Sequence, residues 1–164
     1  MKIKDLLYKI ELFISGTAFS VLVLVTVMNV FSRFVLMKSF SWTEEISYLC
    51  FNWAVFFGAC ILYANQGLIA IDAVVNRLPK KVQHVVRAVT FAMIFVMCVI
   101  LVIWGLRFSI AAWIRPTPFL QIPYFFFDIS VPISAAIMAG YSVDFFIRSV
   151  RGEDIEELAL EERA

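Results

Sequence analysis

The sequence predicts an all-α integral membrane protein with four transmembrane helices and an amphipathic interfacial helix between the second and third. Of its 164 residues, 62% are hydrophobic and 17 are phenylalanine, whereas soluble domains contain about 45–50% apolar residues. Four separate stretches also reach the roughly 20 mainly apolar residues that a helix needs to cross a bilayer. A soluble domain of this length could not bury so much apolar surface. We therefore expect a single membrane domain.

The four predicted spans cover residues 10–31, 45–63, 85–106 and 124–147. The first follows the basic residues Lys2, Lys4 and Lys9, as a signal peptide would, but its apolar run continues to Phe31. Because that run is too long for a signal peptide, the first span is expected to be a retained helix. The third helix is expected to continue through a second apolar stretch towards residue 114. Pro132 is expected to kink the fourth helix near its outer third.

The distribution of basic residues predicts the orientation of the chain. Four spans place both termini and the middle loop on one side of the membrane, and these regions hold most of the lysines and arginines. The two remaining loops contain only Arg33, Lys38, Arg107 and Arg115. Because positively charged loops stay in the cytoplasm, the N- and C-termini are predicted to be cytoplasmic.

Two adjacent glutamates, Glu44 and Glu45, open the otherwise apolar second span. Ser41 and Glu44 have the spacing of a capping box, and both glutamates suit the positive end of a helix dipole. Adjacent helical residues point about 100° apart, so the two carboxylates cannot face the same partner. Glu45 begins a stripe at helical spacing that is more polar than lipid favours: Tyr48, Asn52, Phe56, Ala59 and Tyr63. We expect this stripe to face protein, with Glu45 meeting Arg33, Arg107 or a basic group of another subunit; helix capping alone is the alternative.

The segment 68–82 between the second and third spans has the pattern of a helix that lies along the membrane surface. Leu68 and Ile71 recur at helical spacing with further apolar residues, whereas Asp72, Lys80 and Lys81 fall mostly on the other side. Such a helix places its apolar face among the lipid tails and its basic residues beside anionic headgroups. Membrane lipids are therefore predicted to bind Leu68, Ile71, Asp72, Lys80 and Lys81. The acidic tail 152–164 is expected to be solvated.

The supply of chemically active residues argues against an enzyme or a cofactor protein. The chain has one histidine, His84, and three cysteines without a C-x-x-C pattern, so neither a haem nor a zinc site is expected. No nucleotide-binding, hydrolase or nucleic-acid-binding motif is present. Glu11 is the one acid that could imitate the membrane-embedded carboxylate of small four-helix exporters. It follows Lys9 by two residues and is expected to be solvated at the membrane edge.

The stretch 33–72 resembles the DctQ-type small membrane subunit of TRAP (tripartite ATP-independent periplasmic) transporters. That family has an arginine, a short loop, a W-T-E-E block, a tryptophan about nine residues further on and then a glycine. The matching residues are Arg33, Trp42, Thr43, Glu44, Glu45, Trp53 and Gly58. The length and the four predicted spans also agree with the family.

The resemblance implies a small subunit of a sodium-coupled uptake system for an organic acid, such as a C4-dicarboxylate or a sialic acid, in the bacterial inner membrane. It implies two protein partners: a large multi-span transporter subunit, in which the sodium ions are expected, and a periplasmic substrate-binding protein. The chain itself is expected to be a non-catalytic scaffold and a possible docking surface for the binding protein. The candidate partner-interface residues are Arg33, Trp42, Glu44, Glu45, Tyr48, Asn52, Trp53 and Arg107. The alternative is a stand-alone four-helix transporter that works as a homodimer.

Overall fold

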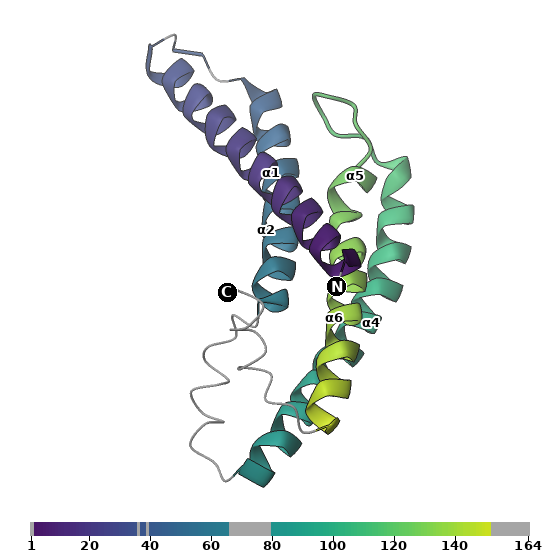
Figure 1. Cartoon of the computed structure of the whole chain (residues 1–164). Coiled ribbons are helices and arrows are strands. Elements are labelled where there is room, and N and C mark those ends of the chain that lie inside the picture. Colours follow the sequence, from purple (N-terminus) through teal and green to yellow (C-terminus); the bar gives the residue numbers. More distant parts are fainter. Residues whose placement is uncertain (1, 36, 39, 66–79, 152–164) are drawn as a thin grey trace.

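The computed structural model consists of long helices that form two antiparallel hairpins (Figure 1). It describes residues 2–35, 37–38, 40–65 and 80–151. The first hairpin contains α1 (Lys2–Val35) and α2 (Ser41–Ala64). The second contains α4 (Lys80–Ala111), which continues as the short 3₁₀ helix η1 (Ala112–Ile114), and then α5 (Phe125–Asp128) and α6 (Ser130–Arg151). The all-helical membrane fold predicted from the sequence is confirmed for the described residues.

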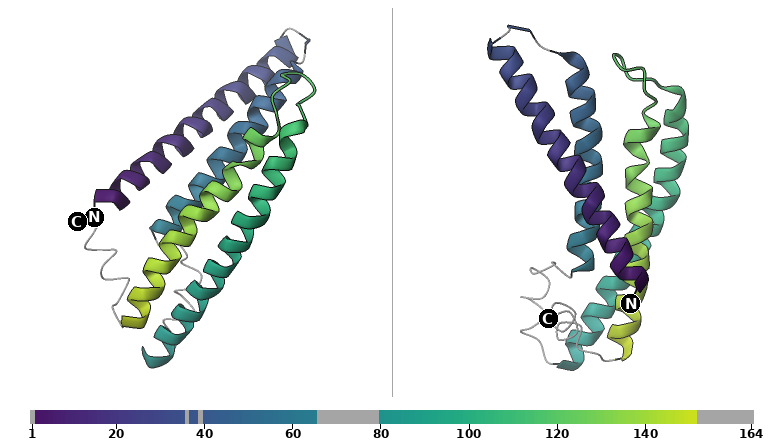
Figure 2. Two further views of the ribbon diagram at one scale, coloured as in Figure 1. Left: turned by 90° about the vertical axis from the view of Figure 1, so that its right-hand side faces the viewer. Right: turned by 45° about the horizontal axis from the view of Figure 1, so that its top comes forward.

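The two hairpins meet along α2, which packs against α5 and α6. We call this contact the hairpin interface. Helix α1 packs on α2, and α4 packs on α6, so that α2 and α6 occupy the inner positions (Figure 2). In the described chain, four helical segments are long and apolar enough to cross a membrane: Leu6–Val35, Ser41–Ala64, Val85–Ile114 and Phe125–Val150. The third of these ends at Ile114, as the sequence predicted.

Small residues allow α1 and α2 to approach closely within the first hairpin. The hydroxyl of Ser15 donates to the backbone carbonyl of Ala54 at 3.1 Å. A methyl group added at Gly58 would lie 3.5 Å from the Ser15 hydroxyl. Close approach of this kind is typical of membrane helices, where packing and hydrogen bonds replace the hydrophobic effect between helices.

The second hairpin packs a glycine of α4 against a proline of α6. A Cβ atom at Gly105 would lie only 3.2 Å from the ring of Pro132, so the two helices touch at this point. Proline has no N–H to donate to the carbonyl four residues earlier. The helix is in fact interrupted at Ile129, between α5 and α6. The sequence predicted a kink near Pro132, and the structure interrupts the helix three residues before this proline.

The capping box predicted for α2 is wrong: Ser41 is the first residue of α2, its N-cap is Phe40, and no side chain caps the helix. Instead, the hydroxyl of Thr43 donates back to the carbonyl of Phe40. In α6, Arg148 and Asp144 form an ion pair one helical turn apart, with Nε 3.0 Å from Oδ2.

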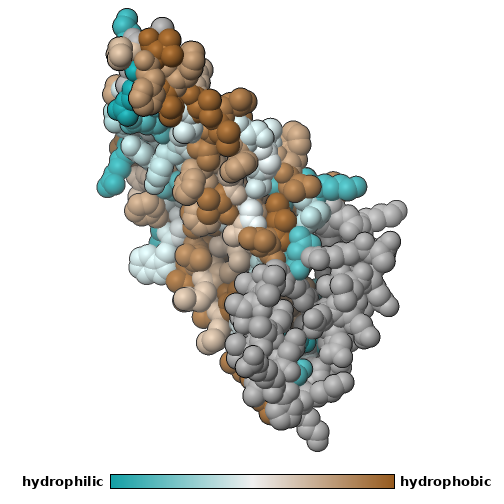
Figure 3. All heavy atoms as spheres, turned by 90° about the vertical axis from the view of Figure 1, so that its left-hand side faces the viewer, coloured by the Kyte–Doolittle hydropathy of each residue, from teal (hydrophilic) through white to brown (hydrophobic). Residues whose placement is uncertain are grey.

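The outward surface of the first hairpin is largely apolar. In Figure 3, hydrophobic side chains cover much of the length of this face, and hydrophilic side chains gather at its upper end. Large side chains such as Phe13, Leu24 and Phe34 are more than two-thirds exposed. Such a surface suits contact with lipid or with another membrane protein.

Candidate functional site

The loop between η1 and α5 is a compact hairpin of its own, visible above α5 in Figure 1. Pro116 and Pro123 form an isolated antiparallel bridge. Thr117 is almost completely buried; its N–H donates to the carbonyl of Ile122 at 2.9 Å, and its hydroxyl accepts from the Ile122 N–H at 3.1 Å. Gln121 turns the chain with a φ of 56°, a left-handed conformation that is uncommon for a residue other than glycine. The loop is therefore held in one conformation.

Glu45 of α2 binds the tip of this loop with both carboxylate oxygens. The backbone N–H groups of Phe119 and Leu120 donate to Oε1 and Oε2 respectively, each at 2.9 Å. Hydrogen bonds to a charged acceptor are about twice as strong as neutral ones. Glu45 thereby fastens the start of α2 to the loop of the second hairpin.

Asn52 and Trp53 continue this contact at the break between α5 and α6. The indole Nε1 of Trp53 donates to the carbonyl of Phe126 at 2.9 Å, and Asn52 Nδ2 lies 3.5 Å from the carbonyl of Phe127. The hydroxyl of Ser130 donates to the same Phe127 carbonyl at 3.0 Å. A helix break at membrane depth is tolerated only where other groups satisfy the carbonyls it leaves free. We call Glu45, Asn52 and Trp53 together the outer clamp.

Further hydrogen bonds connect α2 to α6 nearer the other end of the hairpin interface. The thiol of Cys60 donates to the carbonyl of Ser134 at 3.3 Å. The hydroxyls of Tyr63 and Ser142 lie 2.7 Å apart and share one hydrogen bond. Tyr63 also packs with Tyr141 and Phe145 in the buried hydrophobic cluster of the chain. Cys60 and Tyr63 therefore extend the interface along the same helix.

Glu11 corrects a prediction made from the sequence. It is not solvated at a membrane edge: only 1% of the residue is exposed. Its Oε1 accepts a hydrogen bond from the hydroxyl of Tyr141 at 3.1 Å. The prediction failed because it considered only the distance along the chain from Lys9. The same face of α1 carries Ser15 one turn later, and this spacing signalled a polar face turned towards protein.

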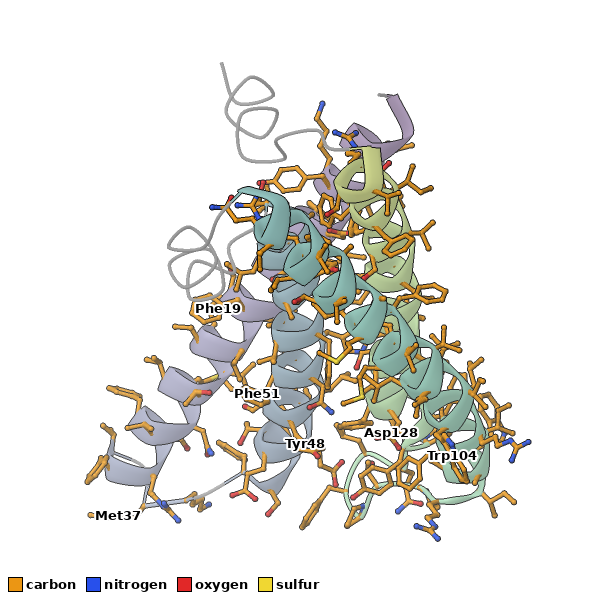
Figure 4. The ribbon with its side chains drawn as sticks, turned by 90° about the horizontal axis from the view of Figure 1, so that it is seen from below. Phe19, Met37, Tyr48, Phe51, Trp104 and Asp128 are labelled. Atoms are coloured by element: carbon orange, nitrogen blue, oxygen red, sulfur yellow. The ribbon has the colours of Figure 1, made fainter. Side chains whose placement is uncertain are left out.

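The predicted partner-interface residues fall into two groups. Glu45, Asn52 and Trp53 meet at the outer clamp, and the ring of Tyr48 stacks on that of Phe127 with 5.9 Å between centroids. In Figure 4, Tyr48 lies between α2 and the second hairpin, whereas Met37 projects away at the end of the first hairpin. Tyr48 nevertheless remains 55% exposed.

The other predicted interface residues lie apart from the outer clamp. Arg33 is exposed in the last turn of α1, and Glu44 is exposed in the first turn of α2. Trp42 is half-buried beside Phe40. Arg107 of α4 is exposed and lies over the ring of Trp104, 5.8 Å from its centroid. The expectation that Glu45 meets Arg33 or Arg107 is therefore wrong, because backbone N–H groups bind it instead.

The predicted membrane-surface residues cannot be compared with the structure in the same way. Leu68, Ile71 and Asp72 lie outside the described residues. Lys80 and Lys81 begin α4, at the end of the segment expected to be interfacial. Within the described part of the chain, no group of three or more His, Cys, Asp or Glu side chains is arranged to hold a metal ion.

Sequence reasoning gave Glu45, Asn52 and Trp53 as candidates for contact with other subunits and missed the groups within the chain that they bind. Backbone N–H groups and carbonyls are present at every position, so the letters of the sequence do not distinguish those of Phe119, Leu120 and Phe126. The available signal was Pro132, which predicted an irregular helix with a free carbonyl at Asp128, close to the bound carbonyls of Phe126 and Phe127. A helix that carries an amide and an indole at adjacent positions was a suitable source of donors for these carbonyls.

The fold and these contacts define a class: a multi-pass membrane protein in which two helical hairpins are joined by polar contacts. Residues 22–152 match the family described as "Tripartite ATP-independent periplasmic transporters, DctQ component". The chain belongs to this family, as the resemblance indicated, and is a DctQ-type TRAP small subunit of the inner membrane.

A relative from Haemophilus influenzae supports this membership. It is named as a TRAP transporter small permease protein and is 29% identical over 86 residues. The match covers 51% of this chain and 53% of the relative. The chain therefore spans about half the length of that relative.

Proposed function

We propose that this chain is the non-catalytic membrane scaffold of a sodium-coupled TRAP transporter that takes up an organic acid, such as a C4-dicarboxylate or a sialic acid. It holds a large transport subunit in the inner membrane, and its outer end offers a docking surface to a periplasmic substrate-binding protein. The observation that carries the proposal is the family match over residues 22–152. Sodium ions bind in the large subunit in this proposal, and the small subunit holds no cofactor.

The distribution of buried surface supports a scaffold with a protein partner. In α1 and in α4, only 6% of the most apolar stretch of the helix is buried inside the chain. These two helices flank the inner pair α2 and α6, so their outward faces are free for a large partner or for lipid. A hairpin pair of fixed geometry, fastened by the outer clamp, would give such a partner a rigid surface.

Several of the predicted interface residues remain suitable for contact with other subunits. Arg33, Glu44 and Arg107 are exposed, and Tyr48 is more than half exposed. We assign the charged residues among them to docking of the soluble partner, because exposed charges steer association more than they add affinity. The amide nitrogen of Asn52 and the indole nitrogen of Trp53 are already bound within the chain, so these two residues act on the partners by keeping the surface in shape.

An orientation test follows from the predicted cytoplasmic termini. Cysteines introduced at Met37 and Gln121, both exposed in outer loops, should react with a membrane-impermeant thiol reagent in intact cells. Cys60 and Cys98 are buried and Cys50 is half-buried, so the unsubstituted chain gives the background. A cysteine replacing Lys2 should react only after the cells are opened; its labelling in intact cells would reverse the orientation.

The decisive experiment reconstitutes uptake from its parts. The large subunit and binding protein encoded with this chain should transport a labelled carboxylate into vesicles only when this chain is present and a sodium gradient is imposed. This chain alone should give no flux. Flux from the purified chain alone would favour the alternative, a stand-alone homodimeric transporter. Uptake that proceeds equally well without this chain would remove the scaffold role.

A further inference from the structure

Glu11 is an acidic side chain in the interior of the helical bundle with one hydrogen bond. It lies inside the first apolar span, Leu6–Val35, and is 1% exposed. The hydroxyl of Tyr141 is 3.1 Å from its Oε1. Its Oε2 is buried and has no hydrogen-bond partner. The outer clamp does not use this residue, and the proposed scaffold role does not require an acid at this position.

The titratable groups around Glu11 are neutral at ordinary pH. Helix α6 contributes the phenol of Tyr141, and α2 contributes the buried thiol of Cys60, which donates to the carbonyl of Ser134. Tyr63 of α2 is bonded to Ser142, the neighbour of Tyr141. Cys98 of α4 lies within electrostatic reach of Cys60.

Among the side chains that the structure describes, the charged groups near Glu11 are exposed or engaged elsewhere. Lys9 is exposed on α1. On α6, Asp144 and Arg148 are paired with each other. Arg87 of α4 is buried and has a contact of its own. In the part of the chain that the structure describes, no basic side chain forms an ion pair with Glu11.

An ionised Glu11 would be costly in these surroundings. A carboxylate taken out of water needs an opposite charge or several hydrogen bonds to offset its lost hydration. Glu11 has one hydroxyl, and its second oxygen has no partner. A metal ion is a poor alternative, because hard cations take about six oxygen ligands and no cluster of acids surrounds the site among the described residues.

We propose that Glu11 is a proton-binding site, and that the bound proton holds α1 to α6. With the proton on Oε2, the carboxyl group is uncharged, and Oε1 still accepts from the hydroxyl of Tyr141 across the same 3.1 Å. The hydroxyl that forms at Oε2 is a neutral group, which costs far less to bury without a partner than a carboxylate does. When the proton leaves for water, a negative charge remains between the helices, and the contact of α1 with the second hairpin weakens.

Infrared spectroscopy tests the proton directly. The full chain is reconstituted in lipid with its partner subunits where they co-purify, and wild type is compared with Glu11→Gln at neutral pH. We expect the wild type to show the carbonyl stretch of a protonated carboxylic acid, shifted in heavy water and lost in Glu11→Gln. A difference spectrum with carboxylate bands and no protonated acid would overturn the proposal.

Two controls separate a bound proton from a merely structural role. Tyr141→Phe removes the hydroxyl and should shift the protonated-acid band without abolishing it. If Glu11→Gln fails to fold, a pH titration of the wild-type band in the same sample gives the answer. A band that is absent at neutral pH and appears only in strong acid would contradict the proposal.

Thermal unfolding supplies an independent measurement. Because the folded chain binds the proton more tightly than the unfolded chain, the unfolding temperature of the wild type should fall as the pH rises. The unfolding temperature of Glu11→Gln should lack this component. Replacing choline by sodium at fixed pH should change neither protein; a sodium-dependent rise confined to the wild type would assign the site to a metal cation and overturn the proposal.

Discussion

Glu45 and Glu11 lie towards opposite ends of the hairpin interface, and the chain holds the two carboxyl groups in different ways. Glu45 lies at the start of α2, and both its oxygens accept backbone N–H groups. Glu11 is buried between the helices, and only one of its oxygens has a partner. The end at the start of α2 therefore suits a permanent charge, whereas the surroundings of Glu11 suit an uncharged acid. The same residue type serves as a fixed fastening in one place and as a protonation-dependent one in the other.

Trp53→Ala should lower the free energy of unfolding more than the other substitutions, because it removes the centre of the outer clamp. The substitution deletes the hydrogen bond to the Phe126 carbonyl and the stacking of the indole on buried Phe57, whose centroid is 5.4 Å away. We expect the free energy of unfolding in mild detergent to fall by about 3 kcal/mol. Trp42→Ala is the matched control and should cost much less; equal losses would remove the special role of Trp53.

Gly105→Ala should cause the next largest loss of stability, because it forces apart α4 and α6, which meet beside the break. The new methyl group would lie 3.2 and 3.3 Å from ring atoms of Pro132. Overpacking of this kind costs about 1–3 kcal/mol, measured as a lower free energy of unfolding. Gly140→Ala has no atom within 4 Å of the new methyl group and should be neutral or slightly stabilising. Similar behaviour of the two variants would show that α4 and α6 adjust freely.

Tyr63→Phe tests the inner end of the interface. It removes the bond to Ser142 and leaves that buried hydroxyl without this partner. The free energy of unfolding should fall by about 1 kcal/mol, because single hydrogen bonds between membrane helices contribute modestly. Tyr48→Phe, at an exposed position, is the control. A double substitution with Ser142→Ala that costs the sum of the single substitutions would contradict the direct bond.

Glu45→Gln should have the smallest effect on global stability and the most local one. The amide side chain offers one acceptor oxygen, so one of the two loop N–H groups loses its bond. We expect faster hydrogen exchange at Phe119 or Leu120, with little change elsewhere in the chain. Glu44→Gln, exposed one residue earlier, should leave exchange at both positions unchanged. Unchanged exchange in Glu45→Gln would mean that the loop holds its shape without the carboxylate.

The sequence was sufficient for the elements that depend on local composition. Apolar length predicted the four spans, and Pro132 predicted the break before α6. The polar stripe that begins at Glu45 correctly predicted a face of α2 that packs on protein, because a helix has a fixed period. The contacts themselves depend on which helices become neighbours. Nothing local tells Glu45 that its partners are the amides of residues more than 70 positions away.

The burial of Glu11 is a second example of a contact that the local sequence does not predict. Its position near Lys9 suggested the membrane edge, because basic residues there lie close to headgroups. The structure places it against Tyr141, 130 positions further along the chain. A residue's distance from the membrane surface can be estimated from helical rise. Whether that residue faces lipid, water or protein depends on the packing of helices that one stretch of sequence does not contain.

The burial of the last span has a consequence for how the chain is made. The span Phe125–Val150 is the least apolar of the four, and the preceding span is the most apolar. Within the most apolar stretch of each span, 44% is buried in Phe125–Val150 but only 6% in the preceding span. A ribosome delivers this segment after α2 and α4, which are then already in the bilayer to receive it. The final helix thus needs little affinity for lipid of its own. A variant from which α2 has been deleted should therefore insert α6 poorly into the membrane.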